Sequence, residues 1–277
     1  MSAPPARSGP GANPTWDPAQ YLRFGGERAR PYWDLLAPVD LGDTPRIVDL
    51  GCGPGTQTAR LLDRWPGAHV VGVDSSPEMI RRAAAISDPP RLRFEMADLR
   101  TWSEGAGADL VVTNATLHWV PGHLDLLGRW LSWLAPGGTL AIGVPANFHA
   151  PSHTLLRQLA DQPRWQHALR TVASMLAVHS PEDYLGTLQG LGATADVWQT
   201  VYYQVLTGAD PVLEWVRGSA LRPYLDVLDA SAAAEFEDEY RHALRTAYPP
   251  GATGATVFPF RRTFVVATAP AEVAVSG

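Results

Sequence analysis

The chain has 277 residues with 22 basic and 28 acidic side chains, a net charge of -6, and 45% hydrophobic residues, enough for a core. All basic residues are Arg, which excludes Schiff-base chemistry through lysine, and the single Cys52 excludes an internal disulfide or a Cys-rich metal site. The acidic balance gives no support for nucleic-acid binding. No apolar run approaches the ~18 residues of a membrane span and no signal peptide opens the chain, so we expect a cytoplasmic protein.

The two ends of the chain are rich in small residues and Pro. Residues 1–14 and 270–277 cannot bury much apolar surface, so the sequence predicts disordered tails there. Between residues 15 and 37, aromatic and basic side chains recur at helical spacing. Gly25 and Gly26 interrupt that spacing, which predicts two short helices rather than one.

From residue 46 onward, short β-type runs alternate with helical stretches. This alternation is typical of βαβ units and predicts a parallel sheet with helices on both faces. Strands are expected at residues 46–52, 68–74, 92–98, 109–114, 139–145, 196–206 and 260–268. Helices are expected at residues 56–65, 77–86 and 123–134, and further helical stretches at 151–190 and 211–248.

The strongest motif is VDLGCGPGTQT, between the first expected strand and the following helix. Gly51, Gly53 and Gly55 allow a sharp turn and let a ligand approach the main chain without meeting a Cβ. The spacing GxGxG is shorter than the dinucleotide pattern GxGxxG, and Asp49 would repel a pyrophosphate but is able to hold an ammonium. Both features argue against an NAD-dependent dehydrogenase. Cys52 is interpreted as a small residue inside the turn.

Carboxylates end the next two expected strands. Asp74 either binds two ribose hydroxyls or caps the helix that starts after Ser75. Met79, one turn into that helix, either contacts adenine or fills the core. Asp98 either accepts a hydrogen bond from the adenine amine, with the Leu99 backbone against the ring, or is a surface carboxylate.

The sequence NATLHWV follows the fourth expected strand, over the expected reaction centre. Asn114 opens it. His118 either faces a substrate as a general acid or base, or caps the following helix. No acidic partner for His118 is identifiable from the sequence.

The blocks DLGCGPGT, VDSSPEMI, ADLRTW and NATLHWV, in this order, resemble the class I S-adenosylmethionine-dependent methyltransferases. The flanking blocks WDPAQYLRFGGERARP, PANFHAPSH, WQTVYYQVL, VLEWVRGSALRP and PFRRTFVVA are similar to trans-aconitate 2-methyltransferases, and the likeness covers roughly residues 16–268. The resemblance implies S-adenosyl-L-methionine as cofactor and esterification of a small polycarboxylic acid, trans-aconitate. The alternatives are another small acid or natural-product acceptor, and a non-catalytic cofactor-binding module.

The resemblance also implies a Rossmann-like α/β fold with a seven-stranded, mostly parallel sheet, helices on both faces and a helical cap. The last strand is expected to be antiparallel, near Phe264. One methyltransferase domain is expected over residues 15–269. It divides into lid helices at 15–37, a cofactor-binding half at 38–148, and cap segments at 149–192 and 208–250. We expect a monomer or homodimer that binds no metal, nucleic acid or membrane.

The cofactor is expected to lie on the glycine loop and the strand ends, with its sulfonium near Asn114 and the segment from Tyr21 to Arg30 folded over it. The expected cofactor-binding residues are Tyr21, Arg30, Asp49, Gly51, Cys52, Gly53, Gly55, Asp74, Ser75, Met79, Asp98, Leu99 and Asn114. A carboxylate acceptor is already ionised at neutral pH, so the reaction needs positioning more than a strong base. His118 is the one candidate for acid or base.

Arg is the expected partner of the acceptor because its planar guanidinium binds carboxylates through two hydrogen bonds. Arg262 is the strongest candidate, since a strand interior is a poor place for an unpaired cation; Arg30 is a further one. Tyr202 and Tyr203 alternate on a strand, so only one can face a ligand. The expected acceptor-binding residues are Arg23, Trp119, Tyr203, Arg222 and Arg262.

Overall fold

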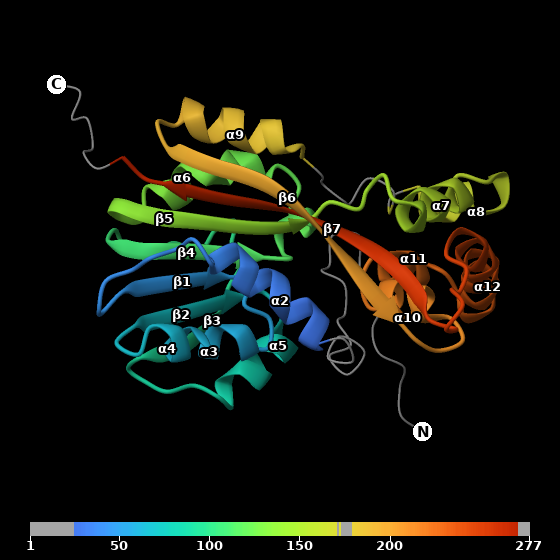
Figure 1. Cartoon of the computed structure of the whole chain (residues 1–277), viewed down its shortest axis with the longest axis horizontal. Helices are drawn as coiled ribbons and strands as arrows, with labels where there is room; N and C mark the ends of the chain where they lie inside the picture. The colour runs from blue at the N-terminus through green and yellow to red at the C-terminus, as the bar shows by residue number, and fades with distance from the viewer. Residues whose placement is uncertain (1–24, 171, 173–178, 271–277) are drawn as a thin grey trace.

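The structure, a computed structural model, describes residues 25–170, 172 and 179–270 (Figure 1). Within this part of the chain, seven strands form one sheet in the order β3-β2-β1-β4-β5-β7-β6. The strands are β1 (Arg46–Leu50), β2 (His69–Asp74), β3 (Leu92–Met96), β4 (Ala108–Asn114), β5 (Leu134–Pro145), β6 (Thr194–Leu206) and β7 (Thr256–Thr268). Strand β7 is antiparallel to both its neighbours and the other pairs are parallel, which confirms the predicted sheet.

Helices cover both faces of the sheet and form a separate lobe at one end (Figure 1). In chain order they are α2 (Gly25–Leu36), α3 (Thr56–Ala59), α4 (Leu61–Arg64), α5 (Pro77–Ala84), the short 3-10 helices η1 (Leu117–Trp119) and η2 (His123–Leu126), α6 (Leu127–Leu131), α7 (Pro151–Ala160), α8 (Pro163–Leu169), α9 (Pro181–Gly190), α10 (Pro211–Arg217), α11 (Arg222–Val227) and α12 (Ala230–Ala247). The continuous helices expected at 56–65 and 123–134 are each divided in two.

The sheet core follows from the alternation of side chains along each strand. On β1, Ile47 joins the apolar cluster under helices α2 and α4, and Val48 joins the cluster on the opposite face under α6 and α9. Helix α2 buries Leu35 and Leu36 in the first of these clusters. The cofactor-binding half is therefore a sheet with two apolar faces, each closed by helices.

The helical lobe is carried by the two longest strands. Strand β7 pairs with β5 from Arg262 to Thr268 and pairs only with β6 from Thr256 to Arg261, so the hairpin continues past the end of β5 (Figure 1). Phe258 and Leu206, at the far end of this hairpin, pack with helices α7, α8, α10, α11 and α12. The lobe thus meets the sheet at the carboxyl end of β5.

Two expectations about segment boundaries change. Helix α9 lies in the expected cap segment 149–192, but Tyr184 and Leu188 pack on the sheet, so the cap is smaller than predicted. Helix α2 begins at Gly25, which makes the glycine pair a helix start. The first expected lid helix, the tail at 1–14 and residues 271–277 lie outside the described residues. Within the described chain, none of the helices has the length and apolar character to span a bilayer.

Candidate active site

The glycine loop joins β1 to α3 with three residues at positive φ, where only glycine is unstrained. A Cβ at Gly51 would lie 2.1 Å from the Thr116 hydroxyl, and one at Gly55 would lie 2.6 Å from the Phe94 ring. Gly53 differs, because a Cβ there would have no atom of the described chain within 4 Å. Gly51 and Gly55 are therefore needed for packing, and the loop faces open space at Gly53.

Asp49, near the end of β1, is buried under this loop with 3% of its surface exposed. Tyr32 of α2 and Thr58 of α3 both donate hydrogen bonds to its Oδ2, at 3.1 and 2.7 Å. Burial raises the pKa of Asp49 to about 6, against the lowering effect of these two hydrogen bonds. The carboxylate thus holds the strand end, the lid helix and the helix after the loop together.

Asp74 ends β2 beside the glycine loop. Its Oδ2 accepts from the Gly53 amide at 2.9 Å and its Oδ1 from the Ser76 amide at 2.8 Å. The side chain that caps α5 is that of Ser76, which accepts from the Met79 amide at 3.4 Å. Burial raises the pKa of Asp74 despite these two amide donors. Ser75 is exposed at the same strand end, and Met79 is buried.

Asp98 and Leu99 follow β3. The Arg100 guanidinium and backbone amide both donate to Asp98, and they lower the pKa of this half-exposed carboxyl. Leu99 is buried, and its carbonyl accepts from Arg129 at 2.6 Å. The expected adenine contact by Asp98 would therefore be made by a carboxylate that Arg100 already holds in place.

The end of β4 lies directly against the glycine loop. Thr116 donates to the Gly51 carbonyl at 3.3 Å, and Ala115 adopts the left-handed φ of 57° that is strained for a residue with a Cβ. The Asn114 Oδ1 is buried without a hydrogen-bond partner among the described residues. Strain and an unpaired buried acceptor at one strand end are typical of a ligand site.

A second group of polar residues lies where the helical lobe joins the sheet. Arg262, 4% exposed, is opposite Pro145 at the point where β7 leaves β5. His118 is half-buried, and its Nδ1 has no hydrogen-bond partner within the described chain. Burial, then the Arg262 cation, then His153 lower the pKa of His118 to about 3. His118 is therefore neutral at physiological pH, so it is not available as a general acid, and its low pKa makes it a weak base.

His153 was not identified from the sequence, because a lone His in a helical stretch carries no spacing signal. It lies on α7, where the Ser152 hydroxyl is 3.1 Å from its Nδ1. Burial and the Arg157 cation lower its pKa to about 4. His118, His153 and Arg262 thus form a group of one cation and two neutral imidazoles, with the Arg157 cation beside His153. The region is locally positive within an acidic chain.

Tyr202 rather than Tyr203 faces this region. Tyr203 is 69% exposed, whereas Tyr202 is 5% exposed and donates to Asp34 of α2 at 2.7 Å. The Arg30 guanidinium lies 5.4 Å from the centre of the Tyr202 ring and 3.4 Å from Asp34. Tyr203, which the sequence places at the acceptor, is therefore exposed on the other face of β6, and Arg30 lies beside β6 rather than on the glycine loop.

The other expected acceptor residues have different surroundings. Trp119 is half-buried with its ring 4.7 Å from that of His118, so it lies at the site. Arg222 is in the helical lobe, where it forms an ion pair with Asp226 at 3.3 Å on its own helix. Tyr21 and Arg23 lie outside the described residues. Trp119 and Arg262 are the two expected acceptor residues that the structure brings next to His118.

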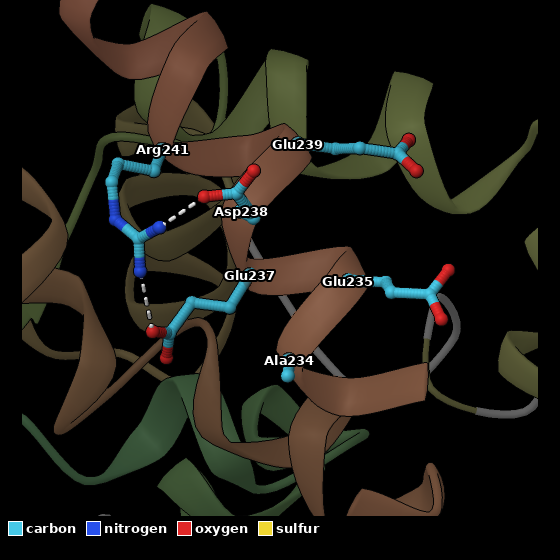
Figure 2. Close-up of a pocket in the computed structure, with 6 residues that line it drawn as sticks. All are labelled: Ala234, Glu235, Glu237, Asp238, Glu239 and Arg241. Carbon is cyan, nitrogen blue, oxygen red and sulfur yellow. Dashed lines mark hydrogen bonds and ion pairs between the residues drawn. The ribbon is translucent and has the colours of Figure 1, made fainter. Parts of the chain in front are cut away.

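A hollow of about 540 Å³ on the surface of α12, whose lining residues are drawn in Figure 2, is not the candidate site. Its side chains are mostly acidic, and Arg241 pairs there with Glu237 and Asp238. Glu235 and Glu239 point away from that pair in the figure and bind Arg164. These acidic groups are therefore already paired with arginines of the same lobe.

Comparison with known proteins matches this site to methyltransferases. A family model described as a methyltransferase domain covers residues 47–138, which include the glycine loop, Asp74, Asp98 and Asn114. The solved YcgJ protein from Bacillus subtilis is similar in fold, with a TM-score of 0.59 at 12% identity over 87% of this chain and 98% of that one. The solved structure of a putative sarcosine dimethylglycine methyltransferase from Galdieria sulphuraria is also similar in fold, with a TM-score of 0.54 at 12% identity over 94% of this chain and 93% of that one.

The curated relatives give a narrower assignment. A trans-aconitate 2-methyltransferase from Streptomyces coelicolor is 55% identical over 94% of this chain and 89% of its own length. Proteins of the same name from Streptomyces avermitilis and Rhodococcus jostii are 54% and 46% identical, over 93% and 91% of this chain and 98% of each relative. The chain therefore belongs to the trans-aconitate 2-methyltransferase family of S-adenosylmethionine-dependent enzymes.

Proposed function

We propose that the chain methylates a carboxylate of trans-aconitate, and that Arg262 binds the acceptor. The names of its relatives support this acceptor. The observation that carries the proposal is the buried Arg262 cation at the junction of sheet and lobe, beside His118. A guanidinium in that position fits a carboxylate better than it fits a neutral acceptor.

The residues around the glycine loop fit S-adenosylmethionine. Gly53 leaves open space for a ligand close to the main chain, and the Asn114 Oδ1 is a buried acceptor that lacks a donor within the described residues. Asp49 supplies a carboxylate that matches an ammonium group. When bound, the cofactor supplies a methyl group on a positively charged sulfur.

The chain's own residues contribute positioning rather than proton transfer. A carboxylate with an ordinary pKa near ~4 is ionised at pH 7, so no base has to activate it. His118 is neutral at pH 7, and the reaction requires no proton transfer through it. Arg262 fixes one carboxylate of the acceptor, and the α7 segment with His153 closes the lobe side of the region. Holding two reactants in line supplies about 7–11 kcal/mol of rate acceleration in favourable cases.

The test compares two neighbouring arginines of β7. Arg262→Ala removes the buried cation, and Arg261→Ala removes an exposed one from the adjacent position. We expect Arg262→Ala to lower kcat/KM for trans-aconitate by at least about thirtyfold, mostly through KM, because a buried charged contact is worth about 2–5 kcal/mol. Arg261→Ala is expected to keep kcat/KM within about threefold.

Calorimetric binding of S-adenosylhomocysteine shows whether each variant still has an intact cofactor site. Unchanged turnover in Arg262→Ala would show that Arg262 does not bind the acceptor. A panel of carboxylates tests the acceptor itself: higher kcat/KM for another small acid than for trans-aconitate would replace the proposed substrate while keeping the carboxyl methyltransferase reaction.

A further inference from the structure

Consecutive residues of α2 reach the cofactor side of the sheet through different partners. The Tyr32 hydroxyl donates to Asp49 at 3.1 Å, and the Trp33 indole donates to Gln57 of α3 at 2.9 Å. Both bonds tie the lid helix to the segments that flank the glycine loop. Only the first of them reaches an ionisable group, so Tyr32 has a chemical role open to it that Trp33 does not.

The hydrogen bonds to Asp49 are unevenly distributed between its two oxygens. Tyr32 and Thr58 both donate to Oδ2, and none of the described residues donates to Oδ1. Two donors from different helices fix the rotation of the carboxyl group about its Cβ–Cγ bond. The second oxygen is then held in a constant direction with its acceptor capacity unused.

Asp49 also lacks a cationic partner within the part of the chain that the structure describes. The groups that face it are the Asp74 carboxylate from β2, the Cys52 thiol from the loop, and the Tyr32 and Thr58 hydroxyls. None of these carries a positive charge. A buried carboxylate without a cation is costly, and the cost is relieved when a ligand brings the cation.

We propose that Tyr32 is a positioning residue for the cofactor: it holds the Asp49 carboxylate turned so that Oδ1 accepts from the ammonium group of the methionine part of S-adenosylmethionine. This inference rests on the cofactor of the family, S-adenosylmethionine, and not on the proposed acceptor. The bond that forms on binding is a charge-assisted hydrogen bond, which is stronger than one between neutral groups.

The state of each group supports this role. Tyr32 is 3% exposed, and burial together with the Asp49 charge raises the pKa of its phenol, so it remains a proton donor at working pH. The hydrogen bonds from Thr58 and Tyr32 lower the pKa of Asp49, which burial raises to about 6. Loss of the Tyr32 hydroxyl therefore moves this pKa further up and leaves less ionised carboxylate at pH 7.

The test measures the binding of two ligands to Tyr32→Phe by calorimetry at pH values from 5.5 to 8. S-adenosylhomocysteine carries the ammonium group, and 5'-methylthioadenosine has the same adenosine without it. We expect S-adenosylhomocysteine to bind about tenfold more weakly at pH 7. The acid midpoint of binding, which is the pH at which protonation of Asp49 halves the affinity, is expected to be about one pH unit higher. The affinity for 5'-methylthioadenosine is expected to be unchanged.

The matched control is Trp33→Phe, which removes the neighbouring helix-to-loop hydrogen bond and leaves Asp49 untouched. It is expected to keep the acid midpoint of binding. If Tyr32→Phe does not fold, Thr58→Val removes the other Oδ2 donor with little change of shape, and the same shift is expected. Equal losses for both ligands, or an unchanged midpoint, would overturn the proposal. Neither result affects the acceptor assignment, because binding is measured without acceptor.

Discussion

The Tyr202 hydroxyl on β6 donates a 2.7 Å hydrogen bond to Asp34 on α2, across 168 positions of sequence. Strand β6 belongs to the hairpin that carries the helical lobe, and α2 is also bound to the end of β1 through Tyr32. Helix α2 therefore joins the cofactor side of the molecule to the strand pair that contains Arg262.

This relationship predicts the effect of Tyr202→Phe. The change removes a hydroxyl that donates to a carboxylate, and such a bond contributes about 1.5–3 kcal/mol when it is shielded from water. Because Asp34 is partly exposed and can bind water instead, we expect a smaller loss of unfolding free energy, about 1–2 kcal/mol. We also expect a higher KM for the acceptor and unchanged affinity for S-adenosylhomocysteine.

Denaturant unfolding and steady-state kinetics check this expectation. Tyr203→Phe is the matched control, because Tyr203 is adjacent, 69% exposed and on the opposite face of β6. Its unfolding free energy is expected to stay within about 0.5 kcal/mol of the unmodified protein. Equal effects of the two substitutions would mean that the Asp34 bond does not couple the elements.

The glycine loop predicts two different outcomes for two alanine substitutions. At Gly51 the new Cβ would lie 2.1 Å from the Thr116 hydroxyl at a φ of 77°, so Gly51→Ala is expected to lower the unfolding free energy by about 2 kcal/mol or more. At Gly53 the Cβ meets no described atom, and only the left-handed φ costs about 1 kcal/mol.

Gly53→Ala is instead expected to weaken cofactor binding, because its Cβ projects into the open side of the loop. Thermal unfolding without ligand and calorimetry with S-adenosylhomocysteine separate the two effects. A Gly53→Ala variant that binds the ligand normally would mean that the cofactor does not approach the main chain at this residue.

The parallel sheet and the glycine loop could be predicted from the sequence because their signals are local. Alternating strand and helix patterns define βαβ units, and three glycines at a strand end have few other uses. The sequence could not predict which helices of the expected cap segments pack on the sheet instead of in the lobe. Helix α9 has ordinary amphipathic spacing, and its assignment to the sheet depends on Tyr184 and Leu188 meeting residues far away in the chain.

The same limit applies to the site. Asp49 was recognised from its place beside the glycines, but its bond to Tyr32 joins positions 17 residues apart on different elements. The strand pattern predicts that Tyr202 and Tyr203 face opposite sides of β6, but no local signal shows which of the two sides meets α2. His153 comes near His118 only through the packing of the helical lobe.

Substitution of His118 tests whether the reaction proceeds without a general base. The pKa of His118 in the folded protein is about 3, so His118 does not titrate between pH 6 and pH 8. We expect His118→Gln to keep kcat within about tenfold and to leave the pH profile over this range unchanged. Loss of activity by more than about a thousandfold, without loss of substrate binding, would restore a role in proton transfer.

The same substitution has an effect on stability at acid pH. An unfolded His binds a proton below pH 6.5, whereas folded His118 binds one only near pH 3, so unfolding takes up protons as the pH falls through this window. The folded state therefore loses stability from pH 6.5 downward. We expect the unfolding free energy of His118→Gln to decrease less between pH 7 and pH 4.5 than that of the unmodified protein.

Asp49 predicts a conflict between stability and cofactor binding. Its folded pKa of about 6 lies above the ordinary value of 3.8, so the folded state holds a proton more tightly than the unfolded chain does. The effect of pH on stability is therefore opposite to that of a salt-bridged carboxylate. The contribution of Asp49 to the stability of the ligand-free protein is greatest below pH 3.8 and is lost as the pH rises to 6. Above pH 6 the full loss is about 3 kcal/mol.

Asp49→Asn keeps an acceptor oxygen for Tyr32 and Thr58 but carries no charge. We therefore expect this variant to be more stable than the unmodified protein at pH 7 without ligand, by up to about 3 kcal/mol, and the difference to shrink as the pH is lowered toward 4. Its affinity for S-adenosylhomocysteine is expected to fall by tenfold or more, by about the worth of one charge-assisted hydrogen bond. Unfolding at several pH values and calorimetry measure the two effects, and an Asn variant that is less stable at pH 7 would show that the Asp49 charge is balanced within the fold before the cofactor binds.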